Sequence, residues 1–520
     1  MKTFIYAVCI LYFCPLNLFG QTTAMQLYFD ELAKLKQHNG NLLLAENEKV
    51  IMNFTSGFAD FQKNQKNTVN SSFNLASISK IITATAVLQL RDKGKLQLDE
   101  KVNKYLSDFP YKEITIRHLL THTSGLPDLE LFEDLVKQYP DTIVSNQNVI
   151  PELQKWTHGL YFKPGDEFRY CNTEYNVLAL LIEKVSHKSF SDYLQKYIFD
   201  PAEMKDAYVN NPFFFNKKRN FVIAIPQMKP HPGYDSTFVP TDSISRFKYL
   251  TYNNNGTVGQ ANIICTTKDL LRFDIAYFKG KLLSENSIKE ATMPIKLNNS
   301  KIYYHPNMDT MPGNGTMCYG LGWEIFDQPE FGKSVGHGGF KFGLATFYLH
   351  NLEKNQTIIG FDNTAGSEFG RFIFSSELLL NGLPPMQFRT QKSLVTLYGT
   401  HLVNAGANHA ASIFNAHKAD TAYYLNEGEM NDLGYNLFYM SSFNGHKELA
   451  LEVFKLATFI FPDSFNTYDS FGQLLKDSNH TQDAILMYQK SLELNPDNKD
   501  GKRILSELLQ INQLEKDTLK

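Results

Sequence analysis

Apolar runs of strand length occur near both ends of the first 365 residues of this chain. Paired runs are separated by a short polar stretch, a pattern typical of a β-hairpin. The runs are 41–45 with 50–54 near the N-terminus, 344–349 with 357–361 downstream, and two shorter ones, 322–325 and 334–337, just before the second hairpin. Strands at both ends with helices between them predict one antiparallel sheet built from N- and C-terminal pieces of the chain.

Helical spacing of apolar residues fills much of the remaining chain. Apolar residues recur every three residues or so within 24–36, which predicts an amphipathic helix. The mainly apolar run 81–90 predicts a buried helix, and residues 95–315 are expected to form a largely helical insertion with long loops. The predicted fold class is therefore α+β, with an antiparallel sheet flanked by helices and an all-helical insertion.

The tail of the chain contains a repeat. An alanine, an aromatic residue and a proline recur after 34 residues, which is the tetratricopeptide period. They are Ala450, Phe454 and Pro462 in the first unit, and Ala484, Tyr488 and Pro496 in the second. Residues 501–516 have the pattern of a closing helix. The tail is predicted to be an all-α, tetratricopeptide-like domain, and two ordinary amphipathic hairpins are the alternative.

These patterns divide the chain into four parts. Residues 1–20 are predicted to be a signal peptide and 21–370 the sheet-containing domain. Residues 371–430 are predicted to hold a linker and a degenerate helical unit, and 431–520 the helical repeats with their closing helix. The repeats are expected either to dock a protein partner or to pack on the first domain.

The first twenty residues have the features of a cleaved secretory signal. Lys2 supplies a positive start, residues 4–19 are mainly apolar, and Gly20 is a small residue at the expected cleavage site. We therefore expect a secreted or periplasmic protein with no membrane span after cleavage. A retained N-terminal anchor is the alternative.

Composition narrows the classes of function. Of the 520 residues, 43% are hydrophobic, which is ample for two or more domains. The formal net charge is -3 and no basic tract occurs, so nucleic acid is not an expected partner. Beyond the signal only Cys171, Cys265 and Cys318 remain, which do not make a disulfide framework, although one disulfide is left open. No His/Cys cluster has metal-ligand spacing, and neither a metal nor a cofactor is predicted.

Ser77 and Lys80 are the strongest candidates for chemistry. Three residues apart on a helix, they lie on one face, directly before the apolar run 81–90. A lysine that loses hydration has a lowered pKa and can activate a serine as a nucleophile. Ser245 and Lys248 have the same spacing, but no buried run follows them, and a solvated lysine is expected there.

Tyr170 and Asn172 are the next candidates. They follow a Pro-Gly turn and precede an apolar helix, so an extended backbone would place both side chains on one side and Cys171 on the other. This element can deliver a phenol and an amide into a cleft. The similar stretch 252–254 lies in an Asn/Gly-rich loop, which is typical of a surface turn.

A strand candidate that ends in His337, Gly338, Gly339 and Phe340 completes the set. Glycine in a strand often marks close approach of a ligand to the backbone. With these stretches in order, the chain resembles the serine β-lactamase and penicillin-binding-protein-like family, in the branch that holds class C β-lactamases, D-alanyl-D-alanine carboxypeptidases, D-aminopeptidases and related esterases.

Two further segments carry the same resemblance, which covers about residues 25–365. Residues 114–127 resemble the family's "RHLLTHTSGL" segment, and 261–270 resemble its later "GLxSTAxDL" segment. The resemblance implies a β-lactamase/transpeptidase-like fold. It also implies structural roles for His118 and His122, whose spacing of four could be mistaken for a zinc site; the glutamate of a zinc-protease helix is missing.

The resemblance implies a role for each candidate. Ser77 would be the acylated nucleophile, Lys80 its hydrogen-bonded proton carrier, and Tyr170 the base in acylation that also activates water. Asn172 would contact Lys80 and the acyl side chain of the substrate. His337 replaces the family's strand lysine, and the backbone N–H groups of Ser77 and Phe340 would form the oxyanion hole.

One departure from the family pattern changes the expected substrate. Gly338 stands where many relatives carry a Thr or Ser whose hydroxyl helps hold a substrate carboxylate. We therefore predict a serine hydrolase acting through a Ser77 acyl-enzyme on an ester, amide or D-amino-acid peptide. β-Lactamase or D-alanyl-D-alanine carboxypeptidase activity is one alternative. A catalytically weak protein that binds peptidoglycan or a peptide through its helical repeats is another. Residues 210–242, including Phe213–Phe215, are expected to shape the pocket.

Overall fold

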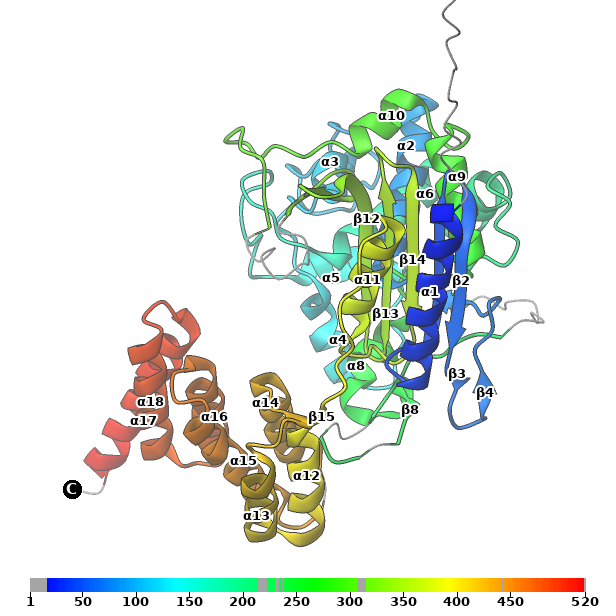
Figure 1. The fold of residues 1–520 in the computed structure, drawn as a ribbon. Coiled ribbons are helices and arrows are strands. Elements are labelled where there is room, and N and C mark those ends of the chain that lie inside the picture. Colours follow the sequence, from blue (N-terminus) through cyan, green and yellow to red (C-terminus); the bar gives the residue numbers. More distant parts are fainter. Residues whose placement is uncertain are drawn as a thin grey trace, which may run out of the picture. The chain divides into compact units, whose positions relative to one another are not determined.

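The computed structural model describes residues 16–213, 222–229, 233–235, 237–305, 315–441 and 443–518. The chain divides into two compact units, which we call the sheet unit and the helical unit (Figure 1). The sheet unit contains Met1–Met228 and Pro240–Gln387, and the helical unit contains Lys229–Val239 and Phe388–Lys520. The chain therefore leaves the sheet unit once, returns to it, and leaves again.

A seven-stranded antiparallel sheet organises the sheet unit, with strand order β10-β11-β12-β13-β14-β1-β2. Its strands are β10 (Thr316–Tyr319), β11 (Glu324–Gln328), β12 (Gly332–Lys341), β13 (Leu344–Asn351), β14 (Gln356–Asp362), β1 (Gly40–Glu46) and β2 (Lys49–Ser56). Both predicted hairpins are present, and β1 pairs with β14 over its whole length. The predicted α+β fold class, with one sheet made from both ends of the domain, is confirmed.

Helices cover both faces of this sheet. On one face lie α1 (Leu16–Lys34) and α11 (Phe369–Leu380), and α9 (Thr267–Phe278) packs on the other (Figure 1). Strands buried on both faces are apolar throughout rather than alternating. This explains why β14 is buried at every position and why β1 carries three consecutive leucines. Helix α11 runs from the end of the predicted sheet domain into 371–430, the part predicted to hold a linker and a degenerate helical unit, yet it packs on β14 of the sheet unit.

The predicted insertion forms several helices and also contains strands of two or three residues. Helix α2 (Ser79–Asp92) comes before the predicted insertion, and the helices within it besides α9 are α3 (Ile116–Leu120), α4 (Glu133–Gln138), α5 (Asn146–Lys155), α6 (Asn172–Ser186), α7 (Phe190–Leu194), α8 (Lys248–Thr251) and α10 (Glu285–Ala291). The short strands of the insertion and those next to it are β3 (Phe58–Asp60), β4 (Gln65–Lys66), β5 (Phe73–Asn74), β6 (Tyr208–Val209), β7 (Gln227–Met228), β8 (Val239–Pro240) and β9 (Ile263–Cys265). Helix α2 is buried from Ser79 to Leu90, as its apolar sequence predicts.

The helical unit consists almost entirely of helices. They are α12 (Leu394–Ala405), α13 (Ala407–His417), α14 (Glu427–Tyr435), α15 (His446–Ile460), α16 (Phe465–Asp477), α17 (Thr481–Leu494) and α18 (Lys499–Thr518), with the short strands β15 (Lys392–Ser393) and β16 (Tyr423–Tyr424). Ala450 and Phe454 are buried on α15, and Ala484 and Tyr488 are buried on α17. The repeated positions thus fall on matching helices, while the tetratricopeptide assignment stays a prediction.

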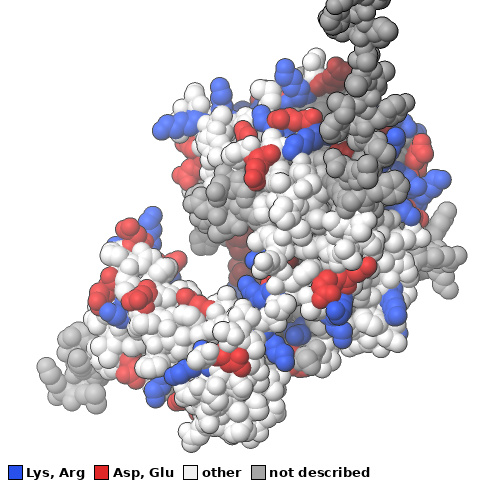
Figure 2. All heavy atoms as spheres, viewed as in Figure 1, with Lys and Arg blue, Asp and Glu red and all other residues white. Residues whose placement is uncertain are grey.

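Surface charge is mixed. On the face shown in Figure 2, Lys and Arg side chains are interspersed with Asp and Glu rather than gathered in one field. Within the described residues, no helix combines the length and the hydropathy needed to cross a membrane. Cys171, Cys265 and Cys318 are buried and free, so no disulfide joins them.

Candidate active site

Ser77 lies in a tight turn directly before α2. Ala76–Ile78 form a single 3₁₀ turn, and Ala76 has φ +47°, a left-handed conformation that costs free energy for a residue with a Cβ. The Asn74 Oδ1 atom accepts the Ala76 N–H at 2.9 Å and holds this turn in place. The serine is thereby fixed at the N-terminal end of a buried helix.

Lys80 lies under Ser77 and is fully buried. Its Nζ atom is 3.2 Å from Ser77 Oγ, 2.8 Å from Asn172 Oδ1 and 3.2 Å from the Gln260 carbonyl oxygen. Burial lowers the pKa of Lys80 to about 7, although the nearby Asp128 carboxylate acts in the opposite direction. Near neutral pH this amine therefore exists in both protonation states.

Tyr170 and Asn172 reach the same cluster from the segment before α6. Tyr170 lies beside both Ser77 and Lys80, and Lys80 Nζ is 4.6 Å from the Tyr170 ring centre. Burial raises the pKa of Tyr170 well above its usual value, although the Ser77 hydroxyl acts to lower it, so the side chain is a neutral phenol. Cys171 points away, with its Sγ atom donating to the Pro127 carbonyl at 3.4 Å. The Cys171 side chain is therefore turned away from Ser77 and is buried.

Asp128 is a member of the site that the sequence reasoning missed. Its Oδ1 atom accepts the Asn172 N–H at 2.6 Å, and its Oδ2 atom accepts the Asn172 Nδ2 amide at 3.1 Å. This pairing turns the Asn172 carbonyl oxygen toward Lys80. The available signal was the position of Asp128, directly after the 114–127 segment, but nothing local connects it with a residue 44 positions away.

Strand β12 forms the opposite wall through its glycines. A Cβ atom on Gly339 would lie 2.7 Å from the Leu75 carbonyl oxygen and 3.1 Å from Ala76 Cβ, so only glycine fits there. At Gly338 the nearest atoms to such a Cβ are 3.9 Å and 4.0 Å away, so a side chain has room. Phe340 follows with its side chain 64% exposed. The strand therefore brings its backbone against the turn that carries Ser77.

His337 is buried and neutral. Its Nε2 atom is 3.1 Å from the Tyr319 hydroxyl, and its Nδ1 atom is 2.5 Å from the Gly338 carbonyl oxygen, to which it donates. Burial, reinforced by the Lys80 charge, lowers the pKa of His337 to about 3. The ring therefore brings no positive charge to the place of the family's strand lysine.

Glu324 is a second residue that the sequence reasoning missed. It lies on β11 beside β12, accepts the Gly338 N–H at 2.9 Å through Oε2, and lies 3.6 Å from His337 Nδ1. Burial raises the pKa of Glu324 to about 7. A single glutamate in a strand gives no sequence signal, so only the pairing of β11 with β12 reveals its position.

The histidines of the 114–127 segment serve the scaffold. His118 Nδ1 accepts the Thr115 N–H at 3.2 Å and closes a capping box at the start of α3. His122 Nδ1 and Glu174 Oε2 are 2.5 Å apart, and burial lowers the pKa of His122 and raises that of Glu174. The His122 ring centre lies 4.3 Å from that of Tyr170 and supports the phenol from behind.

The second Ser-x-x-Lys stretch lies away from the cluster. Lys248 is partly exposed and forms an ion pair with Asp141 at 2.5 Å, as expected for a solvated lysine. The expectation of a surface turn at 252–254 is wrong in part, because Asn253 and Asn254 are buried. Their amides bind backbone carbonyl groups, which lets an Asn-rich stretch pack inside.

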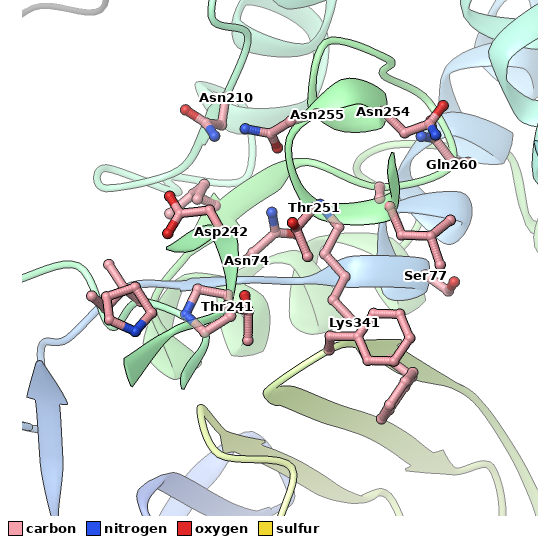
Figure 3. A pocket seen from close by; sticks show the side chains of 18 of the residues that line it. Asn74, Ser77, Asn210, Thr241, Asp242, Thr251, Asn254, Asn255, Gln260 and Lys341 are labelled. Carbon is pink, nitrogen blue, oxygen red and sulfur yellow. The ribbon is translucent and has the colours of Figure 1, made fainter. Parts of the chain in front are cut away.

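A cavity of about 520 Å³ opens beside Ser77 (Figure 3). The part of 210–242 that the structure describes supplies one wall, through Asn210, 223–226 and 240–242. Phe214 and Phe215 lie outside the described residues, and Phe213 is half exposed. The remaining walls come from the turn, α8, the loop before β9 and the end of β12, with Asn74, Ser77, Asn172, Thr251, Gln260 and Lys341 among the polar groups.

Comparison with known proteins identifies the family of this chain. The family model described as "Beta-lactamase" matches residues 28–373. "Penicillin-binding protein 4*" of Bacillus subtilis is 31% identical over 369 residues, which are 69% of this chain and 76% of that relative. "Protein flp" of Staphylococcus aureus strain MRSA252 is 30% identical over 327 residues, which are 61% of this chain and 58% of that relative.

Solved structures show the same fold. A penicillin-binding protein from Bacillus halodurans has a TM-score of 0.55 at 22% identity, covering 68% of this chain and 99% of its own. The D-amino acid amidase of Ochrobactrum anthropi SV3, solved with D-phenylalanine, has a TM-score of 0.55 at 23% identity, covering 70% and 98%. The chain belongs to the β-lactamase family of penicillin-binding-protein-like serine hydrolases.

Proposed function

We propose that this protein hydrolyses an ester, amide or D-amino-acid peptide through an acyl-enzyme on Ser77. The observation that carries the proposal is the cluster itself. Lys80 Nζ lies within hydrogen-bond distance of both Ser77 Oγ and Asn172 Oδ1, and Ser77 lines a cavity. A nucleophile, its base and an orienting group in contact are the minimum for covalent catalysis.

Acylation begins with the neutral form of Lys80. This amine takes the Ser77 proton as Oγ attacks the substrate carbonyl, and a tetrahedral intermediate forms. The backbone N–H groups of Ser77 and Phe340 are proposed to hold its oxyanion. The C–O or C–N bond to the leaving group then breaks, and the leaving group receives the proton that Ser77 lost. Water then attacks the acyl-enzyme in the same way. The ester bond to Ser77 breaks, which releases the acid product and restores the Ser77 hydroxyl.

Tyr170 is proposed to act as a proton relay. The family resemblance gives this tyrosine the role of a base, which needs a phenolate. Burial raises the pKa of Tyr170 well above its usual value, whereas that of Lys80 is lowered to about 7. The base of this site is therefore proposed to be Lys80. The Tyr170 hydroxyl, beside Ser77, would pass the proton to the leaving group.

The surroundings of Gly338 favour substrates without a carboxylate at that position. Gly338 offers no hydroxyl, His337 is neutral, and the Glu324 carboxyl accepts the Gly338 N–H at 2.9 Å. Once ionised, Glu324 would repel a second carboxylate nearby. This supports ester, amide or D-amino-acid peptide hydrolysis over β-lactamase or carboxypeptidase activity, and the fold of a D-amino acid amidase is of the same kind.

The decisive experiment is mass detection of the acyl-enzyme. A panel of nitrophenyl esters, D-amino acid amides and a β-lactam should give a covalent adduct on Ser77 in the wild-type chain. Ser77→Ala should abolish both the adduct and turnover. Ser245→Ala, which changes the serine of the second Ser-x-x-Lys stretch, is the matched control and should keep full activity.

Two other results would redirect the proposal. Turnover by Ser77→Ala at the wild-type rate would rule out the mechanism. A wild-type chain that forms no adduct with any ester, amide or fluorophosphonate would favour a binding protein. We further propose that the chain works outside the cytoplasm after cleavage near Gly20, which N-terminal sequencing of the exported protein would test.

A further inference from the structure

Lys341 is a cation in the cavity that the proposed chemistry does not use. It is the last residue of β12, directly after Phe340, and its half-buried side chain lines the cavity together with Ser77 (Figure 3). The only other ionisable side chain among the described lining residues is Asp242, which is exposed. An exposed charge is screened by water and salt far more than a buried one. Among the described lining residues, Lys341 is therefore the ionisable side chain that is less screened by solvent.

A fixed amide holds the Lys341 side chain in place. Lys341 Nζ donates to Asn262 Oδ1 at 2.6 Å, and Asn74 Nδ2 donates to the same oxygen at 2.9 Å. Asn262 cannot turn, because its Nδ2 atom donates to the Asn255 and Thr257 carbonyl oxygens at 3.0 Å and 2.9 Å. The ammonium is preorganised on a rigid support instead of moving freely in solvent.

The same network leads to the nucleophile. Asn74 binds Asn262 through Nδ2 and the Ala76 N–H through Oδ1, at 2.9 Å in both cases. Ala76 is the left-handed residue directly before Ser77. The Lys341 cation thus belongs to the structure that positions the reacting serine, so a group bound at Lys341 would be held at a defined position relative to Ser77.

Within the described residues, no carboxylate lies within ion-pair distance of Lys341. Burial lowers the pKa of Lys341 to about 8, which reflects the cost of keeping its charge away from water. A charge that is partly desolvated and unpaired gains strongly from an anionic ligand that replaces the lost hydration. The Lys341 ammonium has three protons and donates one of them to Asn262, so it can still donate to a ligand.

We propose that Lys341 binds an anionic group, such as a carboxylate, of the substrate while Ser77 attacks its ester or amide bond. This inference rests on the proposed serine hydrolase function and specifies its substrate class. The anion would sit in the cavity, on the Phe340–Lys341 side of the site. The opposite side, at Gly338 and Glu324, disfavours an anion.

Matched pairs of esters test the proposal. One pair has the same nitrophenyl leaving group and differs in the acyl part, 4-nitrophenyl hexanoate against the mono-4-nitrophenyl ester of adipic acid. The second pair has the same acyl part and differs in the leaving group, phenyl butyrate against 4-carboxyphenyl butyrate. We expect one pair to show a preference in kcat/KM of about tenfold or more for the anionic ester, which identifies the end that carries the anion.

Substitutions then assign the preference to this lysine. Lys341→Met should lower kcat/KM for the anionic ester about tenfold more than for the neutral ester, and Lys341→Arg should restore part of that difference. Lys333→Met, a change of the same kind on β12 but outside the cavity lining, should keep the preference. A purely structural lysine would instead lower the rates of both esters together.

The outcomes separate this inference from the proposed function. Equal rates for both esters in both pairs, or a preference that survives in Lys341→Met, would overturn the role of Lys341 and leave the Ser77 mechanism intact. Activity that survives in Ser77→Ala would overturn the mechanism itself. A loss of both esters' activity in Lys341→Met, with no recovery in Lys341→Arg, would also count against anion binding.

Discussion

At the scale of single residues, burial sets the charge of each active-site group. Lys80 and His337 lose hydration, and burial lowers the pKa values of both even though carboxyl groups lie nearby. Burial has the opposite effect on Glu324 and Tyr170, whose pKa values it raises. In each case desolvation of the charged form is the largest cause. Near neutral pH, Ser77 therefore lies next to the Lys80 amine, which can lose its proton, and the Tyr170 phenol, which keeps its proton.

The pH dependence of activity follows from Lys80. The base must be neutral, and an amine is neutral above its pKa, so kcat/KM should rise with pH through about 7. Below this value kcat/KM should fall about tenfold per pH unit, measured with a neutral nitrophenyl ester. The acidic side chains that act on Lys80 include Asp128, Glu174 and Glu324, and burial also brings the pKa of Glu324 to about 7.

The Glu324→Gln variant separates the two titrations. If Lys80 is the base, kcat/KM of the variant should still rise with pH near neutrality. The midpoint of this rise should move to slightly lower pH, because the variant lacks a negative charge near Lys80. A rate that no longer changes with pH in Glu324→Gln would assign the titration to the carboxyl instead. Lys80→Arg should be inactive, since a guanidinium stays protonated at every usable pH.

Gly338 tests the link between one side chain and the substrate class. Because a Cβ there would approach no atom closer than 3.9 Å, Gly338→Thr should fold and add a hydroxyl beside the strand backbone. We expect acylation by benzylpenicillin to rise about tenfold, since a hydroxyl donor to a carboxylate contributes a charge-assisted hydrogen bond. Gly339→Ala is the contrasting variant and should lose activity, because its Cβ would lie 2.7 Å from the Leu75 oxygen. An unchanged penicillin rate in a folded Gly338→Thr chain would contradict this prediction.

At the scale of elements, the start of α6 is held by a residue from another segment. The first N–H groups of a helix have no partner within it. Here Asp128 Oδ1 accepts the N–H groups of Asn172 at 2.6 Å and Thr173 at 3.3 Å. A carboxylate at a helix N-terminus is also favoured by the helix dipole. The cap therefore fixes both the beginning of α6 and the orientation of the Asn172 amide.

Asp128→Ala should destabilise the sheet unit and shift its pH profile. Losing a carboxylate that accepts several N–H groups should lower the free energy of unfolding by roughly 1–3 kcal/mol, measured by urea denaturation. Because the Asp128 charge raises the pKa of Lys80, its removal should move the rise in kcat/KM to lower pH. Asp128→Asn is the control that keeps an acceptor oxygen and should restore part of the stability. A shift to higher pH would contradict this assignment.

At the scale of the whole molecule, the two units have separate hydrophobic cores. One core surrounds α2 and the sheet, and another is formed by α12 to α15 with Leu474. In the helical unit, α14 approaches α15 at Gly434, where a Cβ would lie 2.2 Å from Phe454 Cε2. This close approach needs a residue without a side chain.

Gly434→Ala should destabilise the helical unit by roughly 1–3 kcal/mol, because overpacking forces the Phe454 ring or the helix to move. Thermal unfolding followed by hydrogen exchange should show the loss in α14 and α15, while ester hydrolysis by the sheet unit stays at the wild-type rate. Combining Gly434→Ala with Phe454→Leu should recover part of the stability by making space. Equal loss of protection in the sheet would show that the units do not unfold separately.

The sequence by itself determined the features that depend on near neighbours. The paired apolar runs of the hairpins, the apolar run after Ser77 and the spacing of Ser77 with Lys80 are local patterns, and the sheet and the buried helix follow from them. Only the tertiary structure decided which groups Asp128, Glu324 and Lys341 contact, because their partners lie 44, 14 and 79 positions away. It also decided the charge states, since desolvation depends on what surrounds a group and not on its place in the chain.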